Sequence, residues 1–272
     1  MNPKSIINLF SILVLLFSFS FVFPIVISIV FDDGALPIFL KTLISISLLG
    51  LAGLFLTRNI KNDLSQKDGF VIIVMFWIVL SLTGSVPFYL SGMSLIDSVF
   101  ESMSGITTTG ATVISSLDGL PESILFYRQL LQWMGGMGLI VLAIAVMPLL
   151  GIGGGQIYKT EVPGAMGEQR LTPRIKETAQ ALWLIYFGLT AICGILYYLS
   201  GMTAFDAISH AMSTVAIGGF STHDESIGFF NSISIELICI CFMLLSAFSF
   251  ALHYFAIYKR KPLKYAFDPE FR

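Results

Sequence analysis

The feature that most restricts the fold of this chain is a short apolar stretch that continues into a run rich in Thr and Gly. It extends from Leu95 to Leu120 and lies between two long apolar segments. Its helical part is about a dozen residues, whereas a helix that spans a bilayer needs about 20. A short helix followed by irregular backbone at membrane depth is a re-entrant loop, which lines a cavity or lies buried in protein. Ion-conducting pores are built in this way.

The same stretch occurs twice. The run YLSGM occupies residues 89–93 and recurs letter for letter at 198–202. At the same offset, Asp97 corresponds to Asp206 and Gly110 corresponds to Gly219. The matches share one register and one apolar context, so we interpret them as an internal repeat. Internal repetition decides architecture before any local motif does.

The composition identifies a polytopic membrane protein. The chain has 272 residues, of which 56% are hydrophobic and 12% are charged, and its mean hydropathy is +0.86. Soluble domains carry about 25% charged residues. All three cysteines lie inside apolar segments, which argues against a disulfide framework.

Six membrane-spanning segments are predicted, with a kink at Pro24 in the first. With six spans, the clusters of Lys and Arg all fall on one side, which the positive-inside rule assigns to the cytoplasm. Both termini are therefore predicted to be cytoplasmic, and both re-entrant loops are predicted to enter from outside. The expected spans are approximately Ile6–Phe31, Leu36–Thr57, Phe70–Leu90, Ile124–Leu150, Ala179–Leu199 and Ser232–Tyr258.

The loops carry the chemistry expected of a cation path. A cation that leaves water needs oxygen ligands, and a filter supplies them as backbone carbonyls in a narrow run where Gly is favourable. Residues 107–109 of the first loop and 216–218 of the second differ in side chain, so the backbone is the predicted ligand. No strongly basic residue lies in either loop, which argues against an anion path. Acidic residues outside, such as Asp118 and Asp224, are expected to concentrate cations at the mouth.

Several single residues have a structural interpretation that we favour over a functional one. Arg128, near the outer end of the fourth segment, is predicted to extend to the interface or to pair with an acidic loop residue. Glu101 and His210 share one repeat position and are predicted to make buried hydrogen bonds. Asp97 and Asp206 are predicted to cap the short helices.

Three glycine- or His-containing motifs are also interpreted structurally. The small residues Gly135, Gly136 and Gly138 predict close helix packing. The glycine run at 151–155 follows an apolar span rather than a strand, so we interpret it as the start of a cytoplasmic linker and not as a nucleotide site. The acidic residues after His223 provide no complete ligand set, which predicts an exposed polar turn rather than a metal site.

Specific motifs resemble one family along essentially the whole chain. Residues 107–112, TTTGAT, resemble the first filter of the TrkH/TrkG potassium-uptake proteins, which belong to the TrkH/KtrB superfamily of K⁺ transporters. The run QWMGGMG at 132–138 resembles a helix of that family's first repeat. Residues 148–154 and 161–164 resemble its cytoplasmic linker, and IGGFS at 217–221 resembles its second filter.

The resemblance implies a fold class and domain organisation. The fold is expected to be an all-α polytopic membrane protein with a K⁺-channel-like architecture. An N-terminal transmembrane hairpin is expected at residues 1–62, the first span–pore-loop–span repeat at 63–160 and the second at 161–272. Each repeat has two spans, so the two repeats keep the same orientation and are related by an axis along the membrane normal.

The resemblance also implies a function. The chain is expected to be the pore-forming subunit of a Trk-type system for potassium uptake across the bacterial inner membrane, and not an enzyme. Thr108, Thr109, Ile217 and Gly218 would line the K⁺ sites of the selectivity filter, and Gly110 and Gly219 would be the filter glycines. No cofactor is expected besides the transported ion. Proton symport, sodium symport and channel-like flux all remain open.

The expected partners are potassium, membrane lipid, a TrkA-like cytosolic nucleotide-binding regulatory subunit and a second copy in a homodimer; no nucleic acid is expected. The family has four repeats and this sequence has two, so we expect it to be an N-terminal portion of a longer protein. A homodimer of half-pores is the competing interpretation. The alternative functions are a non-conducting membrane interaction subunit and, with less support, an intramembrane enzyme.

Overall fold

The structure is a computed structural model that describes residues 3–58, 66–146, 175–248 and 250–258. All regular elements of these residues are helices, which confirms the all-α fold class. The expected domain boundaries near residues 62 and 160, the glycine run at 151–155 and the last basic cluster lie outside the described residues. By length and composition, three described helices can cross a membrane: Lys4–Phe31, Leu36–Thr57 and Gln180–Leu199.

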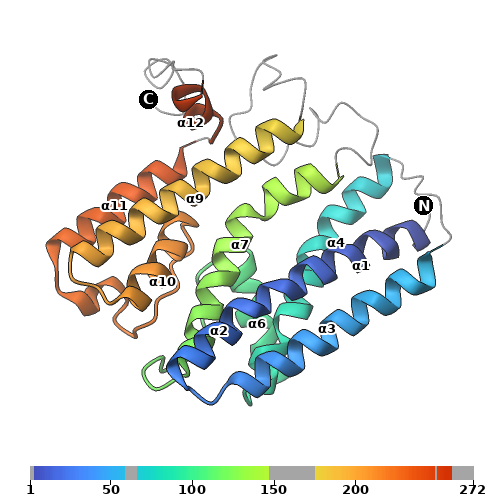
Figure 1. Cartoon of the computed structure of the whole chain (residues 1–272), viewed down its shortest axis with the longest axis horizontal. Helices are drawn as coiled ribbons and strands as arrows, with labels where there is room; N and C mark the ends of the chain where they lie inside the picture. Colours follow the sequence, from blue (N-terminus) through green and yellow to red (C-terminus); the bar gives the residue numbers. More distant parts are fainter. Residues whose placement is uncertain (1–2, 59–65, 147–174, 249, 259–272) are drawn as a thin grey trace.

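The N-terminal helices form an antiparallel pair (Figure 1). Helices α1 (Pro3–Ser18) and α2 (Val22–Phe31) are separated by the 3₁₀ turn η1 (Phe19–Phe21), and α3 (Leu36–Thr57) packs along α1. Pro24 has no N–H to offer the carbonyl one turn earlier, which accounts for the interruption just before it. The regular α-helix is therefore interrupted by a 3₁₀ turn next to the position where a kink was predicted.

The first repeat contains α4 (Gln66–Gly84), α5 (Val86–Leu90), α6 (Leu95–Ile106) and α7 (Glu122–Val146). The third predicted span is not continuous, because it breaks at Ser85. Pro87 occupies the first turn of α5, where its missing N–H is tolerated. Tyr127 of α7 is fully buried and donates its Oη hydrogen to the Gly84 carbonyl at this break, at 2.8 Å.

The second repeat contains α9 (Ile175–Leu199), α10 (Ala204–Val215), the 3₁₀ helix η2 (Ser226–Phe230), α11 (Ile233–Ala247) and α12 (Phe250–Ile257). The sixth predicted span is also broken, because Phe248 adopts an extended conformation after α11. The ring Nε2 of His253 lies 2.8 Å from the Leu245 carbonyl, so it donates a hydrogen bond across this break.

The two short helices have matching bounds and matching caps. Helices α6 and α10 each contain 12 residues, and their first and last residues are related by the offset of the YLSGM repeat. Ser94 accepts a hydrogen bond from the Asp97 backbone and donates one to its carboxylate, and Thr203 does the same with Asp206. The capping residues are therefore Ser94 and Thr203, and not the aspartates as predicted. Asp97 and Asp206 lie at the third helical position, where they accept hydrogen bonds from the capping hydroxyls and their charge suits the positive end of the helix.

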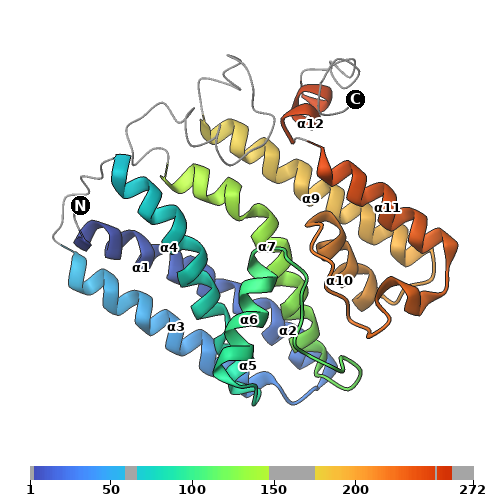
Figure 2. The same ribbon diagram turned by 180° about the vertical axis from the view of Figure 1, so that it is seen from behind.

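Helix α7 joins the two repeats. It contacts α6 and α4 of its own repeat, α2 of the N-terminal pair, and α9 and α10 of the second repeat. Figures 1 and 2 show it between the blue N-terminal helices and the yellow-to-red second repeat from both sides. Helix α7 is therefore placed to contact the loops that follow both short helices.

Two neighbouring glycines of α7 allow both short helices to approach it closely. An ideal Cβ on Gly135 would lie 1.9 Å from the Ile106 carbonyl oxygen, at the end of α6. An ideal Cβ on Gly136 would lie 3.3 Å from Ala216, at the end of α10. The predicted close packing is confirmed, and the C-terminal ends of both short helices rest on the same turn of α7.

We expect Gly135→Ala to destabilise the fold, because the new methyl would overlap backbone that cannot move without shifting α6. Overpacking of this kind costs about 1–3 kcal/mol or more. Gly188→Ala in α9 is the matched control, because nothing lies within 4 Å of its Cβ position. That change should stabilise the helix by up to about 1 kcal/mol. Thermal unfolding of the detergent-solubilised protein checks both, and an unchanged midpoint for Gly135→Ala would contradict the packing.

Candidate ion-conduction site

The two loops leave their helices through the same hydrogen bonds. After α6, the N–H groups of residues 107, 108 and 109 donate to the carbonyls of 103, 105 and 104 at 2.9–3.0 Å. After α10, residues 216, 217 and 218 donate to 212, 214 and 213 at 2.9–3.1 Å. The repeat offset relates every one of these bonds to its counterpart. Two segments with different side chains therefore share one backbone conformation.

Both loops contain the same pair of left-handed residues. The φ angle is +54° at Thr108 and at Ile217, and it is +79° at Gly110 and +83° at Gly219. Glycine accepts this conformation readily, but a β-branched residue with positive φ is a true outlier. Such residues cost about 1–3 kcal/mol each and cluster at functional sites. The sequence analysis singled out the glycines and missed the strain two residues earlier, because Thr and Ile give no signal for it.

The loops touch each other at glycine. An ideal Cβ on Gly110 would lie 2.1 Å from the carbonyl oxygen of Gly218, which belongs to the other repeat. Gly218 is buried, whereas Thr109, Ile217 and Gly219 are exposed. Only a residue without a side chain at position 110 permits this approach. The six residues singled out from the sequence thus lie on two loops in direct contact.

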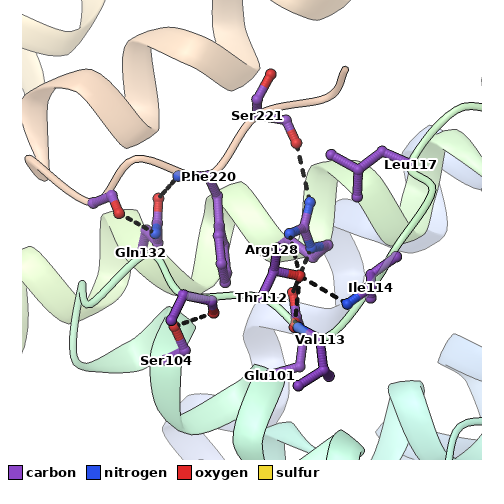
Figure 3. A network of polar contacts seen from close by, with 12 residues as sticks. Glu101, Ser104, Thr112, Val113, Ile114, Leu117, Arg128, Gln132, Phe220 and Ser221 are labelled. Atoms are coloured by element: carbon purple, nitrogen blue, oxygen red, sulfur yellow. Dashed lines mark hydrogen bonds and ion pairs between the residues drawn. The ribbon is translucent and has the colours of Figure 1, made fainter. Parts of the chain in front are cut away.

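A buried ion pair links the two loops just after Gly110 and Gly219. Arg128 of α7 is 1% exposed, and its Nε donates to the carboxylate of Glu101 on α6 at 2.8 Å. The Glu101 carboxylate also accepts hydrogen bonds from the Thr112 hydroxyl and the Val113 backbone. Arg128 donates to the Ser221 carbonyl of the second loop at 3.0 Å (Figure 3). Glu101 thus fixes the first loop through hydrogen bonds, and Arg128 connects Glu101 to the backbone of the second loop.

Two expectations about this network are settled by these contacts. The buried hydrogen bonding predicted for Glu101 is confirmed. The prediction for Arg128 is confirmed only in part. It pairs with an acidic residue of the Leu95–Leu120 stretch, but that partner, Glu101, lies on the short helix, and Arg128 is buried rather than extended to the interface. Its guanidinium also lies 4.2 Å from the ring centroid of Phe220. The carboxylate, the carbonyl and the aromatic face together compensate the positive charge of the Arg128 guanidinium, so it can be buried without hydration.

His210 occupies the position in the second repeat that is equivalent to Glu101. It is a different type of residue, but its side chain also fixes a loop by hydrogen bonds. His210 is buried, its Nδ1 lies 2.9 Å from the Asp206 carbonyl, and its Nε2 lies 2.9 Å from the Ser221 hydroxyl. A carbonyl can only accept, so Nδ1 carries the hydrogen and Nε2 accepts from Ser221. Ser221 corresponds to Thr112 in the repeat. In each repeat, therefore, a side chain of the short helix is hydrogen-bonded to the hydroxyl at the same position of the loop that follows it. The predicted buried hydrogen bond of His210 is confirmed.

Gln132 of α7 was missed in the sequence analysis. Its side-chain nitrogen donates to the Gly218 carbonyl at 2.7 Å, and its side-chain oxygen accepts from the Phe220 backbone at 3.0 Å (Figure 3). The residue is 0% exposed. The available signal was an uncharged polar side chain inside an apolar span, which is costly to bury without partners.

An acidic cavity of about 650 Å³ lies between the α2–α3 turn, residues 117–122 and the start of α10. Asp33, Asp118, Glu122 and Asp206 are among the residues that line it. Partial burial would raise the pKa of Asp33, but hydrogen bonds from Ser123, Ser28 and the backbone outweigh this effect and lower it. Asp33 therefore stays negatively charged at neutral pH.

His223 lines the same cavity and differs from its prediction as part of an exposed polar turn. Its side chain is 20% exposed, and its ring stacks on Phe229 with a centroid separation of 3.6 Å. Its Nε2 lies 3.2 Å from an Asp206 carboxylate oxygen. The aromatic residues of η2 cover the imidazole, which the sequence pattern around His223 did not indicate.

Comparisons with known proteins place these features in a family. The model of the TrkH cation transport protein family matches residues 35–272. The chain is 50% identical over its whole length to the Trk system potassium uptake protein TrkH of Halomonas elongata and 45% identical to that of Escherichia coli strain K12. It covers 57% of each of these relatives, so it spans little more than half of their length.

A solved structure shows the same fold. The crystal structure of the potassium transporter TrkH from Vibrio parahaemolyticus superimposes with a TM-score of 0.86 at 48% sequence identity. The match covers 100% of this chain and 56% of that one. The family is one of transport proteins and not of enzymes, as the sequence analysis expected. The chain belongs to the TrkH family of cation transport proteins.

Proposed function

We propose that the chain contributes two of the re-entrant loops that conduct K⁺ during potassium uptake. The observation that carries the proposal is the shared strained backbone of the loops, with φ at +54° on both Thr108 and Ile217. Two β-branched residues held at the same unfavourable angle in both repeats indicate a backbone shape that is needed in itself. The relatives named as potassium uptake proteins support K⁺ as the ion.

The proposed ligands are main-chain oxygens. In each loop two residues of positive φ, Thr108 and Gly110 or Ile217 and Gly219, are separated by one residue that is not of positive φ. We propose that this alternation turns successive carbonyls toward the same side. Thr108, Thr109, Ile217 and Gly218 would therefore direct carbonyls into the ion path. Replacing the hydration shell of K⁺ with carbonyl oxygens is the established chemistry of potassium filters.

Electrostatics support a cation. Helices α6 and α10 end at the loops, so the partial negative charges of their C-termini, roughly half an elementary charge each, are near the proposed path. The acidic residues of the outer cavity would raise the local concentration of cations at the mouth. The buried Arg128 has its charge compensated by Glu101 and would not repel them.

The setting of the proposed pore follows from the family. We propose a bacterial inner membrane location, with both termini cytoplasmic and the loops entered from outside. A TrkA-like cytosolic regulatory subunit and a homodimer are the proposed partners. Symport with H⁺ or Na⁺ is one proposed mode of coupling and channel-like flux is the other.

Rubidium uptake tests the proposal. The native gene should be expressed in a bacterium that lacks potassium uptake systems of its own, and the entry of ⁸⁶Rb⁺ should be measured with and without excess K⁺. We expect the gene to restore growth at low potassium and to give uptake that K⁺ competes away. Absence of uptake, with the protein present in the membrane, would contradict the proposed function.

A further inference from the structure

The side chain of Gln132, which belongs to the first repeat, is hydrogen-bonded to the backbone of the loop in the second repeat. Its amide pairs with both sides of Gly219, because it donates to the carbonyl of residue 218 and accepts from the N–H of residue 220. The two distances are 2.7 and 3.0 Å, and the side chain is fully buried. The pairing resembles the contacts that a neighbouring β-strand makes with a backbone.

The contact leaves no room for a side chain between Gly218 and the amide. An ideal Cβ on Gly218 would lie 2.3 Å from the Gln132 Cδ and 2.4 Å from its side-chain oxygen. Gly218 therefore lies directly against the amide, and the loop cannot move toward α7. Because Gly135 and Gly136 bring both short helices onto the next turn of α7, Gln132 occupies a fixed point relative to both loops.

The hydrogen bond fixes the direction of one carbonyl in the proposed ion path. A carbonyl oxygen has two lone pairs, and Gln132 uses one of those on Gly218. Rotation of the peptide between residues 218 and 219 would break this buried bond and leave the amide without a partner. Among the described residues, no side-chain hydrogen bond is made to the carbonyl of Thr109, which is the equivalent position in the first loop. The hydroxyl of Thr109 lies 2.8 Å from that of Thr107 instead.

We propose that Gln132 is a positioning residue that sets the discrimination of K⁺ from Na⁺ at the second loop by holding the Gly218 carbonyl in one orientation. The proposal rests on the proposed function of the loops. Discrimination between these ions depends on the number and arrangement of the carbonyls that replace water. A peptide that is free to rotate can adapt to the smaller ion, and a fixed one cannot.

The test compares two variants of Gln132 with a control on the same helix. Gln132→Met keeps the length and shape of the side chain and removes both hydrogen bonds, whereas Gln132→Asn keeps an amide that is one methylene too short to make both. Gln129→Met is the control. Gln129 is also 0% exposed, and within the described residues neither of its side-chain polar atoms has a hydrogen-bond partner.

Uptake of ⁸⁶Rb⁺ and ²²Na⁺ should be measured in membrane vesicles from cells that express the native gene or each variant. We expect the ratio of Rb⁺ to Na⁺ uptake to fall about tenfold in both Gln132 variants, which corresponds to about 1.4 kcal/mol. Gln129→Met should keep the native ratio. A general packing defect would lower the amount of protein or both fluxes together, and would leave the ratio unchanged.

Two results would overturn the inference. One is a native ratio in either Gln132 variant that accumulates in the membrane, and the other is an equal loss of selectivity in Gln129→Met. If Gln132→Met fails to accumulate, Gln132→Asn decides the question with its smaller disturbance of packing. Absence of Rb⁺ uptake by the native protein would refute the proposed function itself, so the two failures are distinguishable.

Discussion

Replacement of Gly110 by alanine is expected to abolish rubidium uptake by the native protein. The added methyl would lie 2.1 Å from the Gly218 carbonyl oxygen, and real Cβ atoms essentially never come within 3.0 Å of a neighbouring heavy atom. The residue also has φ of +79°, at which alanine costs about 1–2 kcal/mol. The loops would have to separate, and the proposed carbonyl ligands would separate with them.

Gly92→Ala is the matched control for Gly110→Ala. Gly92 has φ of +103° and nothing within 4 Å of its Cβ position, so alanine there adds backbone strain without a collision. We expect its uptake to stay within about twofold of native, because the added backbone strain of about 1–2 kcal/mol lowers stability but leaves the contact between the two loops unchanged. Normal uptake by Gly110→Ala, at normal abundance in the membrane, would contradict the close approach of the loops as a requirement for conduction.

Arg128→Met is expected to cause a large loss of stability. It leaves the carboxylate of Glu101, which is 0% exposed, without its cation. Breaking a buried ion pair by removing one partner costs about 3–5 kcal/mol. The hydrogen bond to the Ser221 carbonyl is lost as well, so the second loop should become less ordered. Thermal unfolding of the detergent-solubilised protein measures the effect.

Two further variants identify the cause of that loss. Glu101→Gln combined with Arg128→Met removes the unpaired charge and keeps an acceptor for Thr112 and Val113, so it should recover much of the stability. Arg58→Met is the surface control. Arg58 is exposed and lies over the Phe55 ring, a contact worth about 0.5–1 kcal/mol. An Arg128→Met protein that unfolds at the native temperature would refute the buried network.

The repeat predicted the positions of the two short helices well. The YLSGM offset and the hydrophobic pattern placed both helices and both loops, and the bounds of α6 and α10 differ by that same offset. The offset and the pattern were sufficient because a helix of 12 residues between long apolar segments is too short to span a membrane and has few other possible arrangements there. The spans were harder, since the breaks at Ser85 and Phe248 depend on local backbone geometry that overall hydropathy does not encode.

The polar contacts between the repeats could not be predicted in the same way. Gln132 and Arg128 act on a loop some 90 residues later in the chain, and only the fold brings them there. A single sequence gave no reason to pair Arg128 with Glu101 rather than with water. The left-handed turns at Thr108 and Ile217 also gave no signal, because β-branched residues normally avoid them.

The most direct test of the account is the location of Rb⁺ in crystals of the protein grown with rubidium in place of potassium, by anomalous diffraction. We predict a peak between the two loops, next to the carbonyl oxygens of Thr108, Thr109, Ile217 and Gly218. Peaks confined to the acidic outer cavity, with none beside the loop carbonyls, would contradict the claim that the strained backbone of the two repeats binds the transported ion.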